Sequence, residues 1–174
     1  TIAGQPSRVA RVDRAGLPGF DLWLAPDAFA AVWQAARDAG ATPSGADALE
    51  VLRVDHGVPG HPNEFGPHAV PLELSVEDGY TEGKGCYPGQ EVIERTLALG
   101  RPARQLLRLT LDGPADVGAD LQSEGRVAGV LTSVATRPDG VVVGLALVKR
   151  KYLDAEAFTC GDVAAHPRTT SPAA

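Results

Sequence analysis

The chain has 174 residues, a formal net charge of −6, two cysteines and no methionine. Its content of 44% hydrophobic and 22% charged residues is typical of a globular protein. The longest apolar run, residues 141–148, is far shorter than the roughly 18 residues of a membrane span, and the acidic balance argues against broad binding of nucleic acid.

The N-terminal residues predict a pair of strands. Residues 8–12 and 20–24 are short β-prone runs, and alternate side chains of the second run are apolar. The segment between them contains two glycines and a proline, which favours a tight connection. We therefore expect a hairpin at the start of the chain.

Two helices are expected after this hairpin. The first begins at Pro26, and its apolar residues recur at the spacing of one buried stripe. The stripe comprises Phe29, Val32, Trp33 and Ala36. The second helix is expected to begin at Ser44 and to end at Gly57. The pattern predicts an α+β layer in which helices cover one face of a sheet, with both Trp23 and Trp33 in the core.

Residues 57–90 contain too much glycine and proline for regular structure, and irregular segments of this length are usually functional or disordered. Five potential metal ligands gather near their start, namely Asp55, His56, His61, Glu64 and His68. Their spacing is not that of a helical zinc motif, so we favour a polar loop and predict no metal site.

The densest motif lies at residues 82–95, Glu-Gly-Lys-Gly-Cys-Tyr-Pro-Gly-Gln-Glu-Val-Ile-Glu-Arg. Cys86 precedes a helix predicted over residues 90–97, and Lys84 adds a nearby cation. A helix N-terminus and a cation both favour the reactive thiolate, which indicates a functional Cys86 assisted by Lys84. The alternatives are a small buried hydrophobic residue in a glycine-rich turn, or a nucleophile paired with a histidine.

From residue 104 onward the pattern is almost wholly β. Apolar runs separated by turn residues predict a small barrel, with Cys160 as a barrel residue. The runs are residues 106–111, 121–124, 126–136 and 141–148. The turn at residues 137–140, Arg-Pro-Asp-Gly, predicts a hairpin between the last two.

These patterns divide the chain into three parts. Residues 1–100 form an α+β body, residues 101–165 a C-terminal β-barrel, and residues 166–174 a frayed tail. The small number of cysteines and the absence of a secretion signal favour a reducing, cytoplasmic location.

Residues 84–91, Lys-Gly-Cys-Tyr-Pro-Gly-Gln-Glu, resemble the signature of the YgfZ family, folate-binding relatives of the glycine-cleavage T protein (aminomethyltransferase). The resemblance extends through residues 48–57, 69–73, 100–106 and 144–149. It implies ferredoxin-like α/β layers followed by a small C-terminal barrel, with tetrahydrofolate bound in a central opening.

The resemblance also implies a role in assembly or repair of iron–sulfur enzymes, including some that modify tRNA, with Cys86 as the functional thiol. Its partners are then a folate and iron–sulfur client enzymes, without direct binding of nucleic acid or membrane. Amide and carboxylate side chains match the edge of a pterin, and arginine matches the carboxylates of a glutamate tail. The candidate cofactor-binding residues are Arg53, Glu73, Tyr87, Gln90, Glu91 and Arg95.

Three departures from the T-protein enzymes bear on activity. Ala48-Leu49-Glu50 stands where those enzymes have Ala-Arg-Asp, and residues 14–19 lack the acidic side chain of their Gly-Tyr-Thr-Gly-Glu turn. The N-terminal lobe of the family has no counterpart, so we expect the chain to begin within a longer product or to be a short family member. A folate-dependent aminomethyltransferase and a non-enzymatic scaffold without folate binding remain as alternatives.

Overall fold

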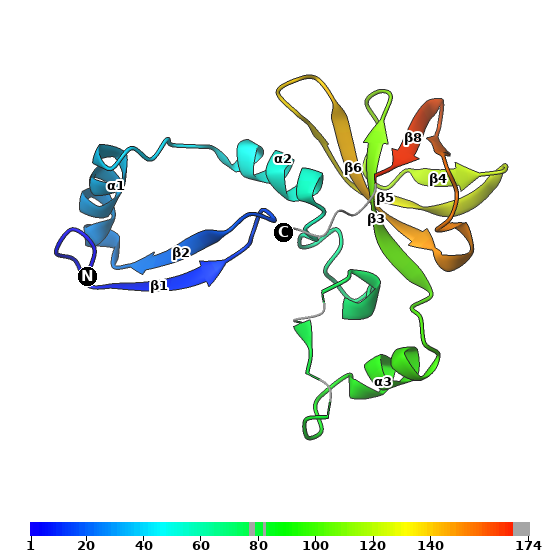
Figure 1. Cartoon of the computed structure of the whole chain (residues 1–174), viewed down its shortest axis with the longest axis horizontal. Coiled ribbons are helices and arrows are strands. Elements are labelled where there is room, and N and C mark those ends of the chain that lie inside the picture. The colour runs from blue at the N-terminus through cyan, green and yellow to red at the C-terminus, as the bar shows by residue number, and fades with distance from the viewer. Residues whose placement is uncertain (77–78, 82, 169–174) are drawn as a thin grey trace.

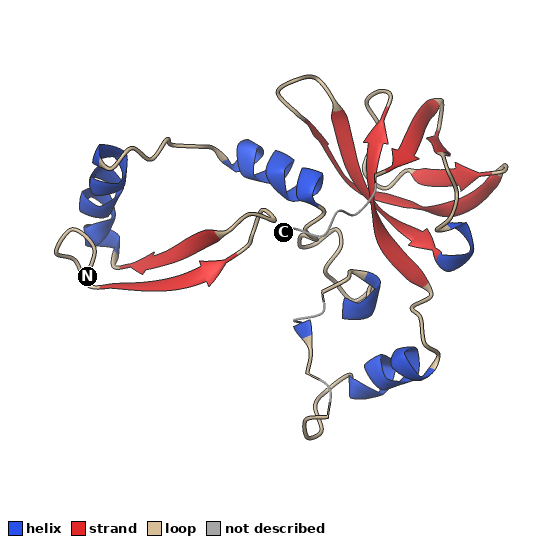
Figure 2. Ribbon diagram, in the orientation of Figure 1, coloured by secondary structure: helices blue, strands red, loops and turns tan. Residues whose placement is uncertain are grey.

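The computed structural model describes residues 1–76, 79–81 and 83–168. The molecule is elongated, with an N-terminal arm at one end and a β-barrel at the other, joined by helix α2 (Figures 1 and 2). We call residues 1–44 the arm. Glu82, which begins the predicted motif, and residues 169–174 of the predicted tail lie outside the described residues.

The arm contains two antiparallel strands, β1 (Ser7–Val12) and β2 (Gly19–Leu24), which confirm the predicted hairpin. A 3-10 turn, η1 (Pro26–Ala28), leads into helix α1 (Phe29–Asp38), which stands at one end of the two-stranded ribbon (Figure 1). At the other end, the turn of the hairpin meets α2. Gly16 has φ +71°, and a Cβ there would lie 2.4 Å from the Cβ of His56, so this contact requires glycine.

The predicted buried stripe of α1 is wrong in part. Val32 is buried, but Phe29 and Trp33 are 56% and 45% exposed, with their rings stacked at a centroid distance of 5.6 Å. Trp23 is also exposed and not in a core. The spacing of a stripe shows which side chains share a face, and here that face is only partly covered, since Val32 is buried and Phe29 and Trp33 are exposed.

Helix α2 (Ala46–His56) begins two residues later than expected, with Gly45 rather than Ser44 at its N-cap and no side-chain capping bond. It ends at Gly57 as expected, which has φ +80°. A Cβ at Gly57 would lie 2.7 Å from the Cδ of Arg108, so the left-handed conformation and the close approach to β3 both require glycine.

The segment after α2 is largely irregular, as predicted, with a short 3-10 turn η2 (Pro71–Glu73). Helix α3 (Gln90–Ala98) follows the glycine-rich loop and lies below the barrel in the view of Figure 1. No described helix has the length and apolar character needed to cross a membrane.

The C-terminal strands close into an antiparallel barrel in the order β3-β6-β5-β4-β7-β8, which confirms the predicted mixed α/β fold with a C-terminal barrel. The strands are β3 (Arg104–Leu111), β4 (Asp120–Ser123), β5 (Arg126–Thr136), β6 (Val142–Lys149), β7 (Phe158–Cys160) and β8 (Val163–Pro167). The 3-10 turn η4 (Arg150–Tyr152) follows β6. His166 and Pro167 belong to β8, so the tail predicted from residue 166 is wrong at these two positions.

Strand β6 separates two hydrophobic cores. Ala146 and Val148 face the barrel interior with Leu109, Leu131 and Phe158.

The second core lies outside the barrel. Val143, Leu145 and Leu147 face outward and pack with Val54 of α2 and with Leu74. The longest apolar run of the sequence is thus a strand buried on both faces, and its outer face fixes α2 and the following loop to the barrel.

Candidate functional site

Residues 83–89 of the predicted motif form a largely exposed loop before α3, and residues 90–95 lie in α3. Gly89, the N-cap of α3, has φ +85°, and Cys86 lies three residues before it. Both cysteines are free, but Cys86 is exposed whereas Cys160 is buried in the barrel. Cys86 is therefore not the small buried residue of the alternative reading. Its proposed reactivity stays a prediction.

A pocket of about 400 Å³ lies between this loop and α3, and we call it the loop pocket. Lys84 and Tyr87 line it, and the ammonium of Lys84 stands 4.7 Å from the centroid of the Tyr87 ring. The other lining residues are Val70, Pro71, Gly79, Tyr80, Pro88, Gly89, Val92 and Ile93. An aromatic and apolar lining with one cation can pack against a flat ring that carries an anionic or carbonyl substituent.

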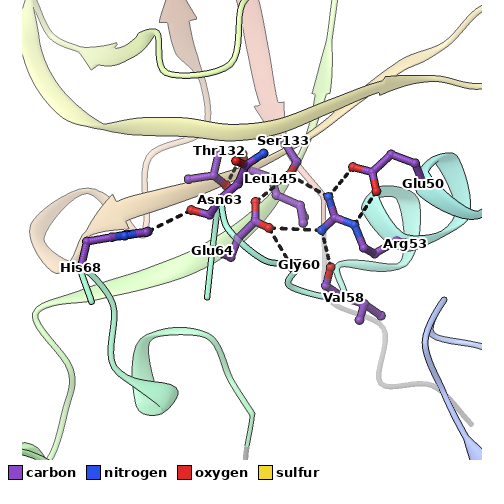
Figure 3. Close-up of polar contacts among 10 residues, drawn as sticks. All are labelled: Glu50, Arg53, Val58, Gly60, Asn63, Glu64, His68, Thr132, Ser133 and Leu145. Atoms are coloured by element: carbon purple, nitrogen blue, oxygen red, sulfur yellow. Dashed lines mark hydrogen bonds and ion pairs between the residues drawn. The ribbon is translucent and has the colours of Figure 1, made fainter. Parts of the chain in front are cut away.

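Arg53 lies elsewhere, in a polar network that fixes α2 to the barrel (Figure 3). Its guanidinium donates to the carbonyl of Val58 at 2.7 Å, to Glu64 at 3.2 Å and to the hydroxyl of Ser133 at 2.8 Å. Glu50 on the same helix accepts from it as well, and this hydrogen bond is the main cause of the raised pKa of Arg53.

Glu64 is the centre of this network and is fully buried. One carboxylate oxygen accepts from the Ser133 hydroxyl at 2.7 Å, and the other accepts from the backbone N–H of Gly60 at 2.8 Å and from Arg53. A buried carboxylate with these partners holds the irregular loop against β5. No local feature of the sequence predicts this burial, since Glu64 lies in a polar, proline-rich segment.

Glu73 belongs to a second group of polar contacts with the barrel; we call this group and the network around Glu64 the two clasps. Arg104 at the start of β3 donates to its two oxygens at 2.9 and 2.7 Å, and the N–H of Val70 donates to it at 3.3 Å. The hydrogen bond to Glu73 raises the pKa of Arg104. Both carboxylate oxygens of Glu73 thus accept hydrogen bonds from within the chain, and these bonds fix η2 to the barrel.

The remaining predicted residues lie on α3. Gln90 and Glu91 form its first turn, and Glu91 is exposed. Arg95, in the last turn, lines a different pocket together with Arg101 and Arg150. Arg95 and Tyr87 thus line two different pockets among the described residues. Among the predicted cofactor residues, Tyr87 lines the loop pocket, and Val70 and Tyr80 are lining residues that lie outside the motif.

The polar residues at 55–68 do not converge. Among the described residues, no three His, Cys, Asp or Glu side chains are placed to hold a metal ion. Asp55 instead pairs with Arg168 beyond β8, Glu64 binds Arg53, and the ring of His68 contacts the carbonyl of Asn63 at 3.0 Å.

Fold and sequence comparisons agree on the class of protein, an aminomethyltransferase-like chain with a C-terminal barrel. Residues 104–173 match the family described as CAF17, C-terminal beta-barrel domain. The structure of glycine cleavage system aminomethyltransferase T from Bartonella henselae matches 95% of this chain and 49% of its own, with a TM-score of 0.77 and 22% identity. That similarity establishes the fold.

Two relatives, both named aminomethyltransferase, match most of the chain. The protein from Nostoc sp. (strain PCC 7120) is 31% identical over 157 residues, which cover 87% of this chain and 41% of that protein. The protein from Thermus thermophilus is 33% identical over 147 residues, which cover 79% of this chain and 38% of that protein. The chain is thus similar in sequence to these aminomethyltransferases and spans about two fifths of their length.

Proposed function

We propose that this protein is a YgfZ-like, tetrahydrofolate-binding accessory protein that supports assembly or repair of iron–sulfur enzymes in the cytoplasm, including enzymes that modify tRNA. One observation carries the proposal. The Lys84–Glu91 stretch that resembles the YgfZ signature presents an exposed thiol directly beside an aromatic-lined pocket. The aminomethyltransferase-like fold supports the folate part of the proposal.

The loop pocket fits one part of a folate better than the whole. Its volume of about 400 Å³ and the rings of Tyr80 and Tyr87 suit the stacking of a pterin or aminobenzoyl ring. The side chains predicted to bind the pterin edge and the glutamate tail, Glu73 and Arg53, are engaged in the two clasps. We therefore assign ring packing to the loop pocket and derive no chemical step on the folate.

Cys86 has the accessibility that a functional thiol requires. The loop pocket adjoins it in sequence on both sides, through Lys84 and Tyr87, so a ligand in the pocket would lie next to the thiol-bearing loop. The proposed role of Cys86 is contact with the client enzyme or its cluster.

Titration of the chain with tetrahydrofolate under anaerobic conditions tests the ligand. We expect saturable heat of binding that Tyr87→Ala weakens by about tenfold or more, since the ring loses its stacking partner. Phe20→Ala removes an equally large exposed ring from the arm and serves as the matched control. Absence of binding in the unmodified chain, or equal loss in both variants, would contradict the assignment of the pocket.

Complementation of a bacterial strain that lacks its YgfZ-family protein tests the accessory role. Cys86→Ala is expected to abolish complementation at unchanged protein level, whereas Thr81→Ala, an exposed substitution in the same loop, is expected to retain it. Full complementation by Cys86→Ala would remove the thiol from the proposal. Complementation without any folate binding would favour the scaffold alternative.

The names of the two relatives favour aminomethyl transfer as the second candidate. This candidate predicts tetrahydrofolate-dependent one-carbon transfer from an aminomethyl donor, measured as methylenetetrahydrofolate formed per mole of chain. The chain has Leu49 where the enzymes have arginine, which weakens this candidate. Turnover above the no-protein background would establish it over the accessory role.

A further inference from the structure

A strongly basic pocket lies on the barrel side of α3, apart from the loop pocket. Its volume is about 570 Å³, and three segments contribute to it: the last turn of α3, the linker to β3 and the end of β6 with η4. Its cations are Arg95, Arg101, Lys149, Arg150 and Lys151, and none of its described lining residues is a carboxylate. We call it the basic pocket. The chain as a whole carries a net charge of −6, so this pocket is a positively charged region on an acidic protein.

Backbone pairing holds the cations together. Arg104 stands opposite Lys149 in the β3–β6 register, and the N–H of Arg150 donates to the carbonyl of Ala103 at 2.9 Å. These bonds fix the linker that carries Arg101 beside η4. Arg101 and Arg150 also line an adjoining cavity of about 250 Å³, to which Asp154 contributes a carboxylate, so the two arginines contribute to both cavities.

The arginines of the basic pocket are not paired with carboxylates among the described residues, a property they share with five arginines elsewhere: Arg8, Arg11, Arg37, Arg108 and Arg126. Among the described residues, five arginines each have a carboxylate oxygen within 4.0 Å. They are Arg14, Arg53, Arg104, Arg137 and Arg168. Arg95, Arg101 and Arg150 have no such partner in that part of the chain, although Glu91 is one helical turn from Arg95.

The two lysines keep their charge available as well. Lys149 donates to the carbonyl of Val127 at 2.8 Å, which uses one of its three N–H groups and leaves its charge unneutralised. The ammonium of Lys151 stands 4.5 Å from the centroid of the Tyr152 ring. Like charges at this density repel one another, and a bound anion would relieve the repulsion.

We propose that the basic pocket binds a small molecule through a di- or triphosphate group. Guanidinium groups bind phosphate oxygens in a bidentate manner, and an oligophosphate concentrates several negative charges over a few bonds, as the clustered cations require. The volume lies within the range of ligand pockets. A nucleotide and a free oligophosphate share this chemistry. The proposal does not depend on folate binding at the loop pocket.

Calorimetric titration of the 174-residue chain with inorganic tripolyphosphate and with ATP at low salt tests the proposal. The double variant Arg101→Ala/Arg150→Ala is expected to weaken binding by about tenfold or more, because two bidentate contacts are lost. Arg8→Ala/Arg37→Ala removes the same charge from exposed arginines of the arm and is expected to leave affinity unchanged. Arg95→Ala/Lys151→Ala provides a second disruption should the first variant unfold early in a thermal melt.

The outcomes separate the sources of the phosphate. Tighter binding of ATP than of tripolyphosphate assigns a nucleotide, and equal affinities assign the phosphate chain alone. Three results would overturn the proposal: no heat of binding for either probe, equal weakening in the pocket and arm variants, or equal affinity for a tricarboxylate of the same charge.

Discussion

The barrel and the arm use similar side chains with opposite results. Leu109, Leu131 and Phe158 of the barrel are at most 2% exposed, whereas Phe20 and Trp23 of the arm are 69% and 54% exposed. The difference lies in closure. Six strands that pair in a ring enclose an interior, while a ribbon of two strands leaves two faces and two edges open.

Local contacts hold the arm in place of a core. Val9 stands opposite Leu22 across the ribbon, and Arg14 forms an ion pair with Asp21. The hydrogen bond from Arg14 raises the pKa of that arginine and lowers the pKa of Asp21. Such surface contacts each contribute little to the free energy of folding. We therefore expect the stability of the chain to come mainly from the barrel and from the two clasps that fix α2 and η2 to it.

The largest expected effect comes from one residue type placed in both regions. Phe158→Ala removes a ring from the barrel core and is expected to lower the free energy of unfolding by about 3–5 kcal/mol. Phe20→Ala removes an exposed ring from the arm and is expected to change it by about 0.5 kcal/mol or less. Urea titration followed by circular dichroism measures both, and a comparable loss in the two variants would mean that the arm has a core of its own.

The same contrast explains what the sequence could predict of the fold. Residues 126–136 were expected as a strand and form one with the same bounds, because an apolar run between turn residues is a local signal. The exposure of Trp33 could not be predicted in this way, because helical spacing defines a face but does not show whether another element covers it. Barrel burial was predictable only because the neighbouring strands are present in the same chain.

The contacts of the candidate site also divide into those that follow from sequence spacing and those that depend on tertiary packing. The proximity of Lys84 and Tyr87 follows from their sequence spacing and is found in the loop pocket. The partners of Arg53 could not be read from the sequence, since Ser133 is 80 residues away and is brought near only by the packing of α2 on β5. The run of basic residues at 149–151 was visible in the sequence, but its meeting with Arg101 depends on the pairing of β3 with β6.

The clasp around Glu64 is expected to matter next after the barrel core. Glu64→Gln removes a fully buried charge and leaves Arg53 with only the half-exposed Glu50 as an ionic partner. We expect a loss of about 3 kcal/mol in unfolding free energy. Glu50→Gln is the control on the same arginine, and we expect it to cost about 0.5 kcal/mol or less. A loss for Glu64→Gln as small as that for Glu50→Gln would show that apolar contacts alone hold α2 on the barrel.

Acid should loosen the junction between the two regions before it unfolds the barrel interior. Burial by itself raises the pKa of Asp55, but the hydrogen bond and charge of Arg168 outweigh it, so the pKa of this carboxyl lies below its ordinary value. A lowered pKa in the folded state means that the pair stabilises the fold above the ordinary aspartate value of about 4, and that this contribution is lost as the pH falls further.

Urea unfolding of the unmodified chain and of Asp55→Asn from about pH 6 to about pH 3 measures this contribution. We expect the two stability curves to converge as the pH falls, with a separation at neutral pH smaller than the effect of Glu64→Gln, because the Asp55–Arg168 pair is partly exposed. Parallel curves would mean that Arg168 contributes nothing through Asp55. Glu50, whose pKa the hydrogen bond from Arg53 lowers, titrates equally in both proteins.

Thiol reactivity compares the barrel with the loop before α3 and requires no substitution. Cys86 stands exposed in front of α3, whereas Cys160 is enclosed by the barrel, where burial raises the pKa of its thiol and the nearby Asp116 and Asp120 raise it further. A raised pKa leaves less thiolate at neutral pH, so both access and ionisation protect Cys160. We expect iodoacetamide at neutral pH to alkylate Cys86 alone, as read by mass spectrometry of the digested protein, and to alkylate both cysteines in concentrated urea. Modification of Cys160 at the rate of Cys86 in the native protein would mean that β7 opens from the barrel far more often than a closed sheet permits.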